Sequence, residues 1–70
     1  MALIDSTPYK FKEGDVVVHI KSGRFYVIRS TSVREEDLVG SYNYQSPEGG
    51  IVFNRTYLAM EGAFQLANNI

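Results

Sequence analysis

The stretch DVVVHIKSGRFYVIRS, residues Asp15–Ser30, carries the pattern that decides the fold. It contains two runs, Asp15–Ile20 and Arg24–Ser30, that are rich in β-branched and aromatic residues, and such residues pack well on the pleated surface of a sheet. Residues 21–23 (KSG) lie between them, and their glycine can adopt the positive φ that a three-residue hairpin loop requires. The stretch therefore predicts two antiparallel strands joined by a short turn.

The rest of the chain alternates turn signals with short strand patterns. Residues 31–40 (TSVREEDLVG) are polar and acidic, which favours a loop or a single helical turn. In residues 41–45 (SYNYQ) tyrosines alternate with polar residues, as they do in a half-buried strand. The later segments are expected to form a turn at 46–50 (SPEGG), a fourth strand at 51–55 (IVFNR), a helical turn at 56–62 (TYLAMEG) that Gly62 ends, and a fifth strand at 63–66 (AFQL).

Length and composition limit the fold to one small domain. The 70 residues are 44% hydrophobic and 21% charged, as in a globular chain with a single core. Short strands at close spacing are typical of domains that close or bend the sheet to hide its edges. We expect an all-β fold, either a small SH3-like barrel or a strongly bent antiparallel meander of about five strands. Residues 1–10 would be an N-terminal extension and residues 11–70 the domain.

Composition and charge argue against several classes of protein. The chain has no cysteine, so it forms neither disulfides nor thiolate metal sites, and the cytoplasm is the expected compartment. Seven Lys and Arg against eight Asp and Glu give a net charge of −1, which provides no overall attraction to nucleic acid or to an anionic membrane. No apolar run is long enough to span a bilayer, so we expect no membrane association.

Three segments, HIKSGRFYVI (19–28), YQSPEGGIVFNR (44–55) and MEGAF (60–64), occur in the order found in a family of uncharacterised bacterial and phage domains. The chain resembles this family over residues 11–66. The matching positions are His19, Ser22, Gly23, Tyr26, Tyr44, Phe53 and Arg55. Thr56 stands where the family prefers proline, and Phe53 where it prefers tryptophan. The resemblance implies a small β-barrel domain in a bacterial or phage setting, and it implies no particular activity.

The inventory of reactive groups argues against catalysis. Acid–base and nucleophilic mechanisms need at least two groups placed within hydrogen-bond reach. His19 is the only histidine, and Glu35, Glu36 and Asp37 form one local run instead of a spaced pair. We therefore expect no enzyme, no metal site and no cofactor. We expect His19 to be a turn residue whose ring bonds a backbone carbonyl or the Ser22 hydroxyl.

Side-chain parity suggests a binding site formed by arginines. Side chains two residues apart share a face of a strand, and two such rows end in arginine: Phe25, Val27 and Arg29, and Ile51, Phe53 and Arg55. In a meander the second and fourth strands run in the same direction. Arg29 and Arg55 would then emerge at the same end of the barrel, while His19 would lie at the opposite end.

The candidate binding residues are therefore Arg29 and Arg55, with Tyr42 and Tyr44 as stacking surfaces near them. Guanidinium groups suit phosphates and carboxylates, and tyrosine rings suit a base or a peptide. The alternative is that Arg29 pairs with an acidic residue of the run at 35–37 and that the stem of Arg55 only covers apolar surface.

These expectations favour a non-enzymatic binding module, a phage or bacterial accessory protein that binds a host protein or sequesters a small anionic ligand such as a nucleotide. Such a protein could inhibit a host defence, and if phage-encoded it would act in the host cytoplasm. A core this small also predicts a homo-oligomer, because association hides strand edges. The alternative is an SH3-like adaptor for nucleic acid, which the charge balance disfavours.

Overall fold

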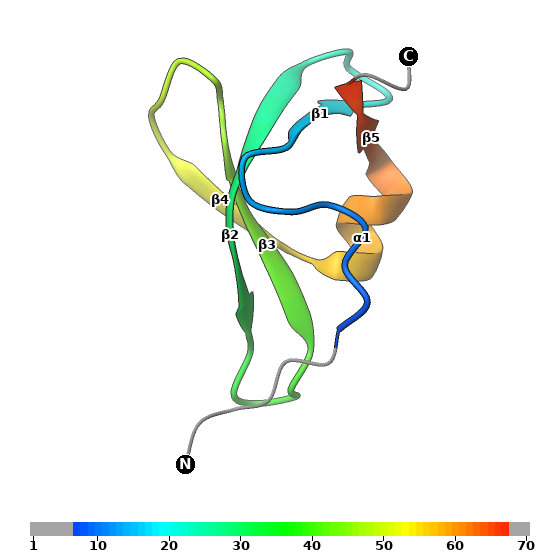
Figure 1. Ribbon diagram of the computed structural model, residues 1–70, viewed down its shortest axis with the longest axis vertical. Coiled ribbons are helices and arrows are strands. Elements are labelled where there is room, and N and C mark those ends of the chain that lie inside the picture. The colour runs from blue at the N-terminus through cyan, green and yellow to red at the C-terminus, as the bar shows by residue number, and fades with distance from the viewer. Residues whose placement is uncertain (1–6, 68–70) are drawn as a thin grey trace.

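The computed structural model describes residues 7–67 of the protein, as an all-β domain with one short helix (Figure 1). Most of the expected N-terminal extension, residues 1–6, and the last three residues of the expected domain lie outside the described residues. In chain order the elements are β1 (Val16–His19), β2 (Phe25–Val33), β3 (Gly40–Gln45), β4 (Val52–Thr56), α1 (Tyr57–Ala63) and β5 (Phe64–Leu66).

The hairpin predicted at residues 15–30 is confirmed. Strands β1 and β2 pair antiparallel, with Val17 opposite Tyr26. The loop between them closes through two backbone hydrogen bonds, in which Gly23 N donates to His19 O at 2.7 Å and His19 N donates to Arg24 O at 2.8 Å. Gly23 has a φ of 74°, the left-handed conformation for which a glycine was expected.

The five strands form one antiparallel sheet in the order β4-β3-β2-β1-β5. The first four strands are a meander, and β5 returns to pair with β1, as Figure 1 shows. Strands β4 and β5 are the two edges, and the sheet is not closed into a barrel. The structure thus confirms the all-β meander among the expected forms.

Strand β2 is longer than the sequence pattern predicts, because it continues through Val33. The pairing with β3 shifts by one residue between Ile28 and Ser30, at a bulge that contains Arg29. Beyond the bulge, Asn43 Nδ2 donates to the hydroxyl oxygens of Ser30 at 3.0 Å and Ser32 at 3.1 Å. These side-chain hydrogen bonds join β3 to β2 beyond the bulge, where the two strands remain paired although their side chains are polar. The prediction of a loop from residue 31 is therefore wrong for residues 31–33.

The two faces of the sheet differ in what covers them. The inner face carries Ile28, Tyr42 and Tyr44, and packs against α1, β5 and the segment before β1. The outer face carries Val27, Gln45 and Val52, which lie opposite one another across three strands. The buried core is formed by Phe11, Val17, Ile28, Tyr42, Tyr44, Met60 and Phe64. Burial of these side chains is the main source of stability available to so short a chain.

Residues 7–11 complete the inner side of the core. The backbone N–H groups of Lys10 and Phe11 donate to Tyr42 Oη at 3.0 Å and 3.1 Å. The Lys10 N–H also donates to Glu61 Oε2 at 3.0 Å, so this segment runs beside α1 (Figure 1). Among residues 7–67, no helix combines the length and the apolar character needed to cross a bilayer.

Candidate functional site

A cavity of about 340 Å³ opens on the inner face of the sheet beside the β1–β2 hairpin, and we call it the inner cavity. Its walls come from all five strands and the hairpin loop. They are formed by His19, Ser22, Arg24, Tyr26, Tyr44, Phe53, Arg55 and Phe64. Four of these residues are aromatic, two are arginines, and none is acidic.

Strand β5 forms part of this cavity because its Phe64 side chain lies over the inner face of the central strands. Strand β5 pairs with β1, with Phe64 opposite His19. The Phe64 ring then packs edge-on against two tyrosines of the central strands, at centroid distances of 5.7 Å from Tyr26 and 5.4 Å from Tyr44. Phe53 adds a stacked contact with Tyr44 at 5.4 Å. The result is an aromatic cluster whose exposed edge forms the cavity wall.

Arg55, on β4, is held in place at the mouth of the inner cavity. Its Nε donates a 2.9 Å hydrogen bond to Tyr44 Oη, and its guanidinium carbon lies 5.7 Å from the centre of the Phe64 ring. Arg55 forms no ion pair with residues 7–67. The two terminal nitrogens of the guanidinium therefore keep their donors for a bound anion.

Arg24 is the second cation of the inner cavity. Its backbone N–H donates to Ser22 Oγ at 3.3 Å, which fixes the start of β2. Its guanidinium has neither a hydrogen bond nor an ion pair with any of the described residues. The two arginines thus differ: Arg55 is anchored, whereas Arg24 is free to adjust to a ligand.

His19 behaves locally as the sequence predicts. Its Nδ1 lies 2.8 Å from Ser22 Oγ and accepts a 3.3 Å hydrogen bond from the backbone N–H of Ser22. Because Nδ1 is the acceptor, the neutral ring carries its hydrogen on Nε2. The expectation that His19 lies at the opposite end from Arg55 is wrong, since both residues line the inner cavity. The bend of the sheet brings these two positions together.

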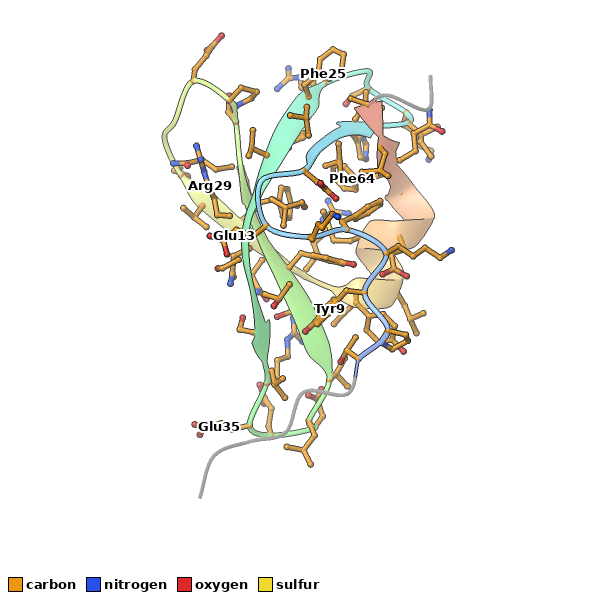
Figure 2. All side chains as sticks on the ribbon, viewed as in Figure 1. Tyr9, Glu13, Phe25, Arg29, Glu35 and Phe64 are labelled. Atoms are coloured by element: carbon orange, nitrogen blue, oxygen red, sulfur yellow. The ribbon has the colours of Figure 1, made fainter. Side chains whose placement is uncertain are left out.

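The sequence prediction that Arg29 and Arg55 share one site is also wrong in its geometry. Arg29 Nε donates to Gln45 Oε1 at 2.7 Å on the outer face, whereas Arg55 contacts Tyr44 on the inner face. Gln45 and Tyr44 are neighbours along β3 and so point to opposite faces. Figure 2 shows Arg29 on the other side of β2 from Phe64. Arg29 also forms no ion pair with the described acidic residues.

The two candidate tyrosines have separate positions. Tyr44 is among the residues that line the inner cavity, but only 4% of it is exposed. Tyr42 has no exposed surface, and its hydroxyl donates to Glu61 Oε2 at 2.7 Å. Burial raises the pKa of Tyr42 to about 12, and the charge and hydrogen bond of Glu61 add to this effect. Tyr42 joins three segments of the fold and offers no free surface to a ligand.

The sequence pattern selected two residues of the inner cavity and missed the other six. Arg55 is selected because side chains two residues apart share a face of a strand, and Tyr44 because tyrosines alternate with polar residues in the segment that forms β3. The missed residues are His19, Ser22, Arg24, Tyr26, Phe53 and Phe64. A signal for four of them was present, because His19, Ser22, Tyr26 and Phe53 are among the residues on which the family resemblance rests.

Other candidate sites are less informative. A larger cavity of about 570 Å³ lies between residues 10–16 and the end of β5, lined by Lys10, Lys12, Gly14, Asp15, Val16, Leu66 and Ala67. It has no aromatic wall, and Asp15 offsets one of its lysines. Within residues 7–67, no group of three or more His, Cys, Asp or Glu side chains is placed to hold a metal ion.

Comparisons of the chain with protein-family models, with curated proteins and with solved structures find no match. The fold and the site therefore define the class: a small all-β domain with an aromatic cavity that carries two arginines.

Proposed function

We propose that the protein is a non-enzymatic binding module whose inner cavity holds a small ligand with an anionic group and a flat ring, such as a nucleotide. One observation carries the proposal: two arginines, Arg24 and Arg55, flank an aromatic wall that includes no acidic residue. Guanidinium groups bind phosphate with paired, charge-assisted hydrogen bonds, and aromatic rings bind the flat part of such a ligand.

The anchoring of Arg55 supports binding on energetic grounds. A long side chain loses conformational entropy when a ligand fixes it, and the bond to Tyr44 has already paid part of that loss. Arg24 supplies a second guanidinium group that can donate hydrogen bonds to the anion. The hydroxyl of Ser22 and Nε2 of His19 are further hydrogen-bonding groups at the cavity.

The proposed setting is a phage or bacterial accessory protein that acts in the cytoplasm by sequestering its ligand, for example to inhibit a host defence. The support for this setting is the family resemblance and the absence of cysteine. A role as a nucleic-acid adaptor is less well supported, because the protein has a net charge of −1 and backbone recognition needs an extended basic surface.

Calorimetric titration of the purified protein with AMP, GMP, inorganic phosphate and adenosine tests the proposal. We expect at least one nucleotide to bind more tightly than phosphate or adenosine alone. Arg55→Glu should weaken that binding by roughly a hundredfold, because it replaces attraction by repulsion. Arg29→Glu is the matched control, with the same charge change on the outer face. Equal loss in both variants, or no nucleotide binding in the wild type, would refute the proposal.

A homodimer is a second proposal, which rests on β4. This strand is a sheet edge; Ile51, just before it, is 77% exposed, and Val52, its first residue, is 53% exposed. Pairing with β4 of a second copy would cover both its backbone groups and these side chains. Sedimentation should then give a dimer that Val52→Lys dissociates, while Leu58→Lys on α1 does not. A wild-type monomer at high micromolar concentration contradicts this proposal.

A further inference from the structure

A further cavity of about 430 Å³ adjoins the inner cavity, and we call it the end cavity. It lies between the start of β2 and the turn that joins β3 to β4. Its walls are Arg24, Phe25, Tyr26, Ser46, Pro47, Glu48 and Phe53. Three of these residues, Arg24, Tyr26 and Phe53, also line the inner cavity, so the two cavities share one wall.

The two cavities differ in charge. The inner cavity carries Arg24 and Arg55 and no carboxylate, whereas the end cavity sets the Glu48 carboxylate against Arg24 alone. The Glu48 side chain is exposed and has no hydrogen bond or ion pair with residues 7–67. Glu48 sits in a turn that is closed by a 2.9 Å hydrogen bond from Gly49 N to Ser46 O, and it lines the end cavity together with Pro47.

We propose that the two cavities form one site for a guanine nucleotide, with the phosphate between Arg24 and Arg55 and the base in the end cavity. This inference rests on the proposed function and adds the identity of the base. The charges set the orientation, since Glu48 would repel a phosphate in the end cavity. In the end cavity, Phe25 and Pro47 provide apolar surface for the flat base. Tyr26 and Phe53, which line both cavities, would contact the sugar that joins the base to the phosphate.

Glu48 is the residue that selects guanine. A carboxylate has two acceptor oxygens and no donor at neutral pH. The Watson–Crick edge of guanine offers two adjacent donors, the ring N1–H and the 2-amino group, which match the two oxygens. Adenine and cytosine each place a ring acceptor beside their amino group, and that acceptor repels a carboxylate. A site built to pair with donors discriminates against a base that lacks them.

Competitive titration with GMP, IMP and AMP tests the inference on the full chain. IMP differs from GMP only by the missing 2-amino group, and we expect it to bind roughly fivefold to tenfold more weakly. Glu48→Gln should reduce the GMP to IMP ratio to near one, while IMP affinity changes little. Glu35→Gln is the matched control, because Glu35 lies at the opposite end of the molecule from Phe25 (Figure 2).

The outcomes separate the inference from the proposed function. If all three nucleotides bind equally and Arg55→Glu abolishes binding of each, the inner cavity binds anions but the guanine assignment is wrong. If Glu48→Gln leaves a GMP preference unchanged, Glu48 does not read the base and the inference also fails. If a phosphotyrosine peptide binds more tightly than GMP, the ligand is a protein segment and the guanine assignment is overturned.

Discussion

Arg55 donates a 2.9 Å hydrogen bond from Nε to the hydroxyl of Tyr44, across the pairing of β4 with β3. The bond holds the guanidinium 5.7 Å from the centre of the Phe64 ring, at the mouth of the inner cavity. A buried tyrosine thereby orients an exposed cation. Part of the ligand-binding free energy that we propose for Arg55 therefore depends on its hydrogen bond to Tyr44.

Tyr44→Phe tests that dependence. The variant keeps the aromatic ring and removes only the hydroxyl, so the fold should be retained with a stability loss of about 1 kcal/mol or less. Nucleotide affinity should fall by about fivefold, because Arg55 loses its anchor and must be ordered by the ligand. Calorimetric titration and a thermal melt measure the two effects. Unchanged affinity in the folded variant means that the anchor plays no part in binding.

Arg24→Ala should weaken nucleotide binding by about tenfold, because it removes one of the two guanidinium groups that we propose hold the phosphate. Its effect on thermal stability should be small, since the side chain has no partner among the described residues. Lys21→Ala is the control, because Lys21 is a cation of the same loop that does not line the inner cavity. Equal effects of the two variants would show that only the overall charge of the loop matters.

Tyr42 should make the protein sensitive to alkaline pH. Its pKa is raised from 10.0 to about 12, chiefly by burial, so the folded state keeps the proton that the unfolded state releases first. The stabilisation is fully present below pH 10 and is lost as pH rises towards 12. Urea unfolding at a series of pH values measures this loss. Tyr42→Phe should lower stability at pH 7 and flatten the decline, and an equally steep decline in the variant would assign it to other groups.

Gly40→Ala should destabilise the fold by about 1–3 kcal/mol, because the new methyl group has no room. A Cβ at this position would lie 2.7 Å from the Cβ of Thr7 and 2.5 Å from Tyr9 Oη. Gly62→Ala is the control, since nothing lies within 4 Å of its Cβ position and alanine favours the helix. Chemical denaturation compares the two. Similar stability in both variants would mean that the segment before β1 does not pack on β3.

The hairpins and their turns could be predicted because their signals are local. Residues 21–23 and 46–50 contain glycines that the turns require, with φ of 74° at Gly23 and 99° at Gly49. The face on which each arginine lies could not be predicted, because it depends on register between strands. The row that contains Val27 and Arg29 and the row that contains Phe53 and Arg55 lie on opposite faces of the sheet. Val27 pairs with Gln45, whereas Phe53 pairs with Tyr44, and these two neighbours in β3 point to opposite faces.

Two further features depend on long-range contacts that no local pattern contains. The alternation of residues in β3 predicts the same role for Tyr42 and Tyr44. In the structure, however, the backbone of Lys10 and Phe11, in the segment before β1, covers Tyr42. The inner cavity likewise forms only when β5 returns to β1 and brings Phe64 over the central strands. Such contacts join segments that are far apart in the sequence, so a local sequence pattern does not predict them.

The most direct test of the account is a map of backbone amide signals by NMR during a titration with GMP. We predict that shifts concentrate at residues 19–26, 46–48 and 53–55, with Tyr44 and Phe64, and that residues 34–40 stay unchanged. This pattern would place the ligand in the inner cavity beside Arg55. Shifts centred on residues 10–16, where the larger cavity lies, or no shifts at millimolar GMP, would contradict the central claim.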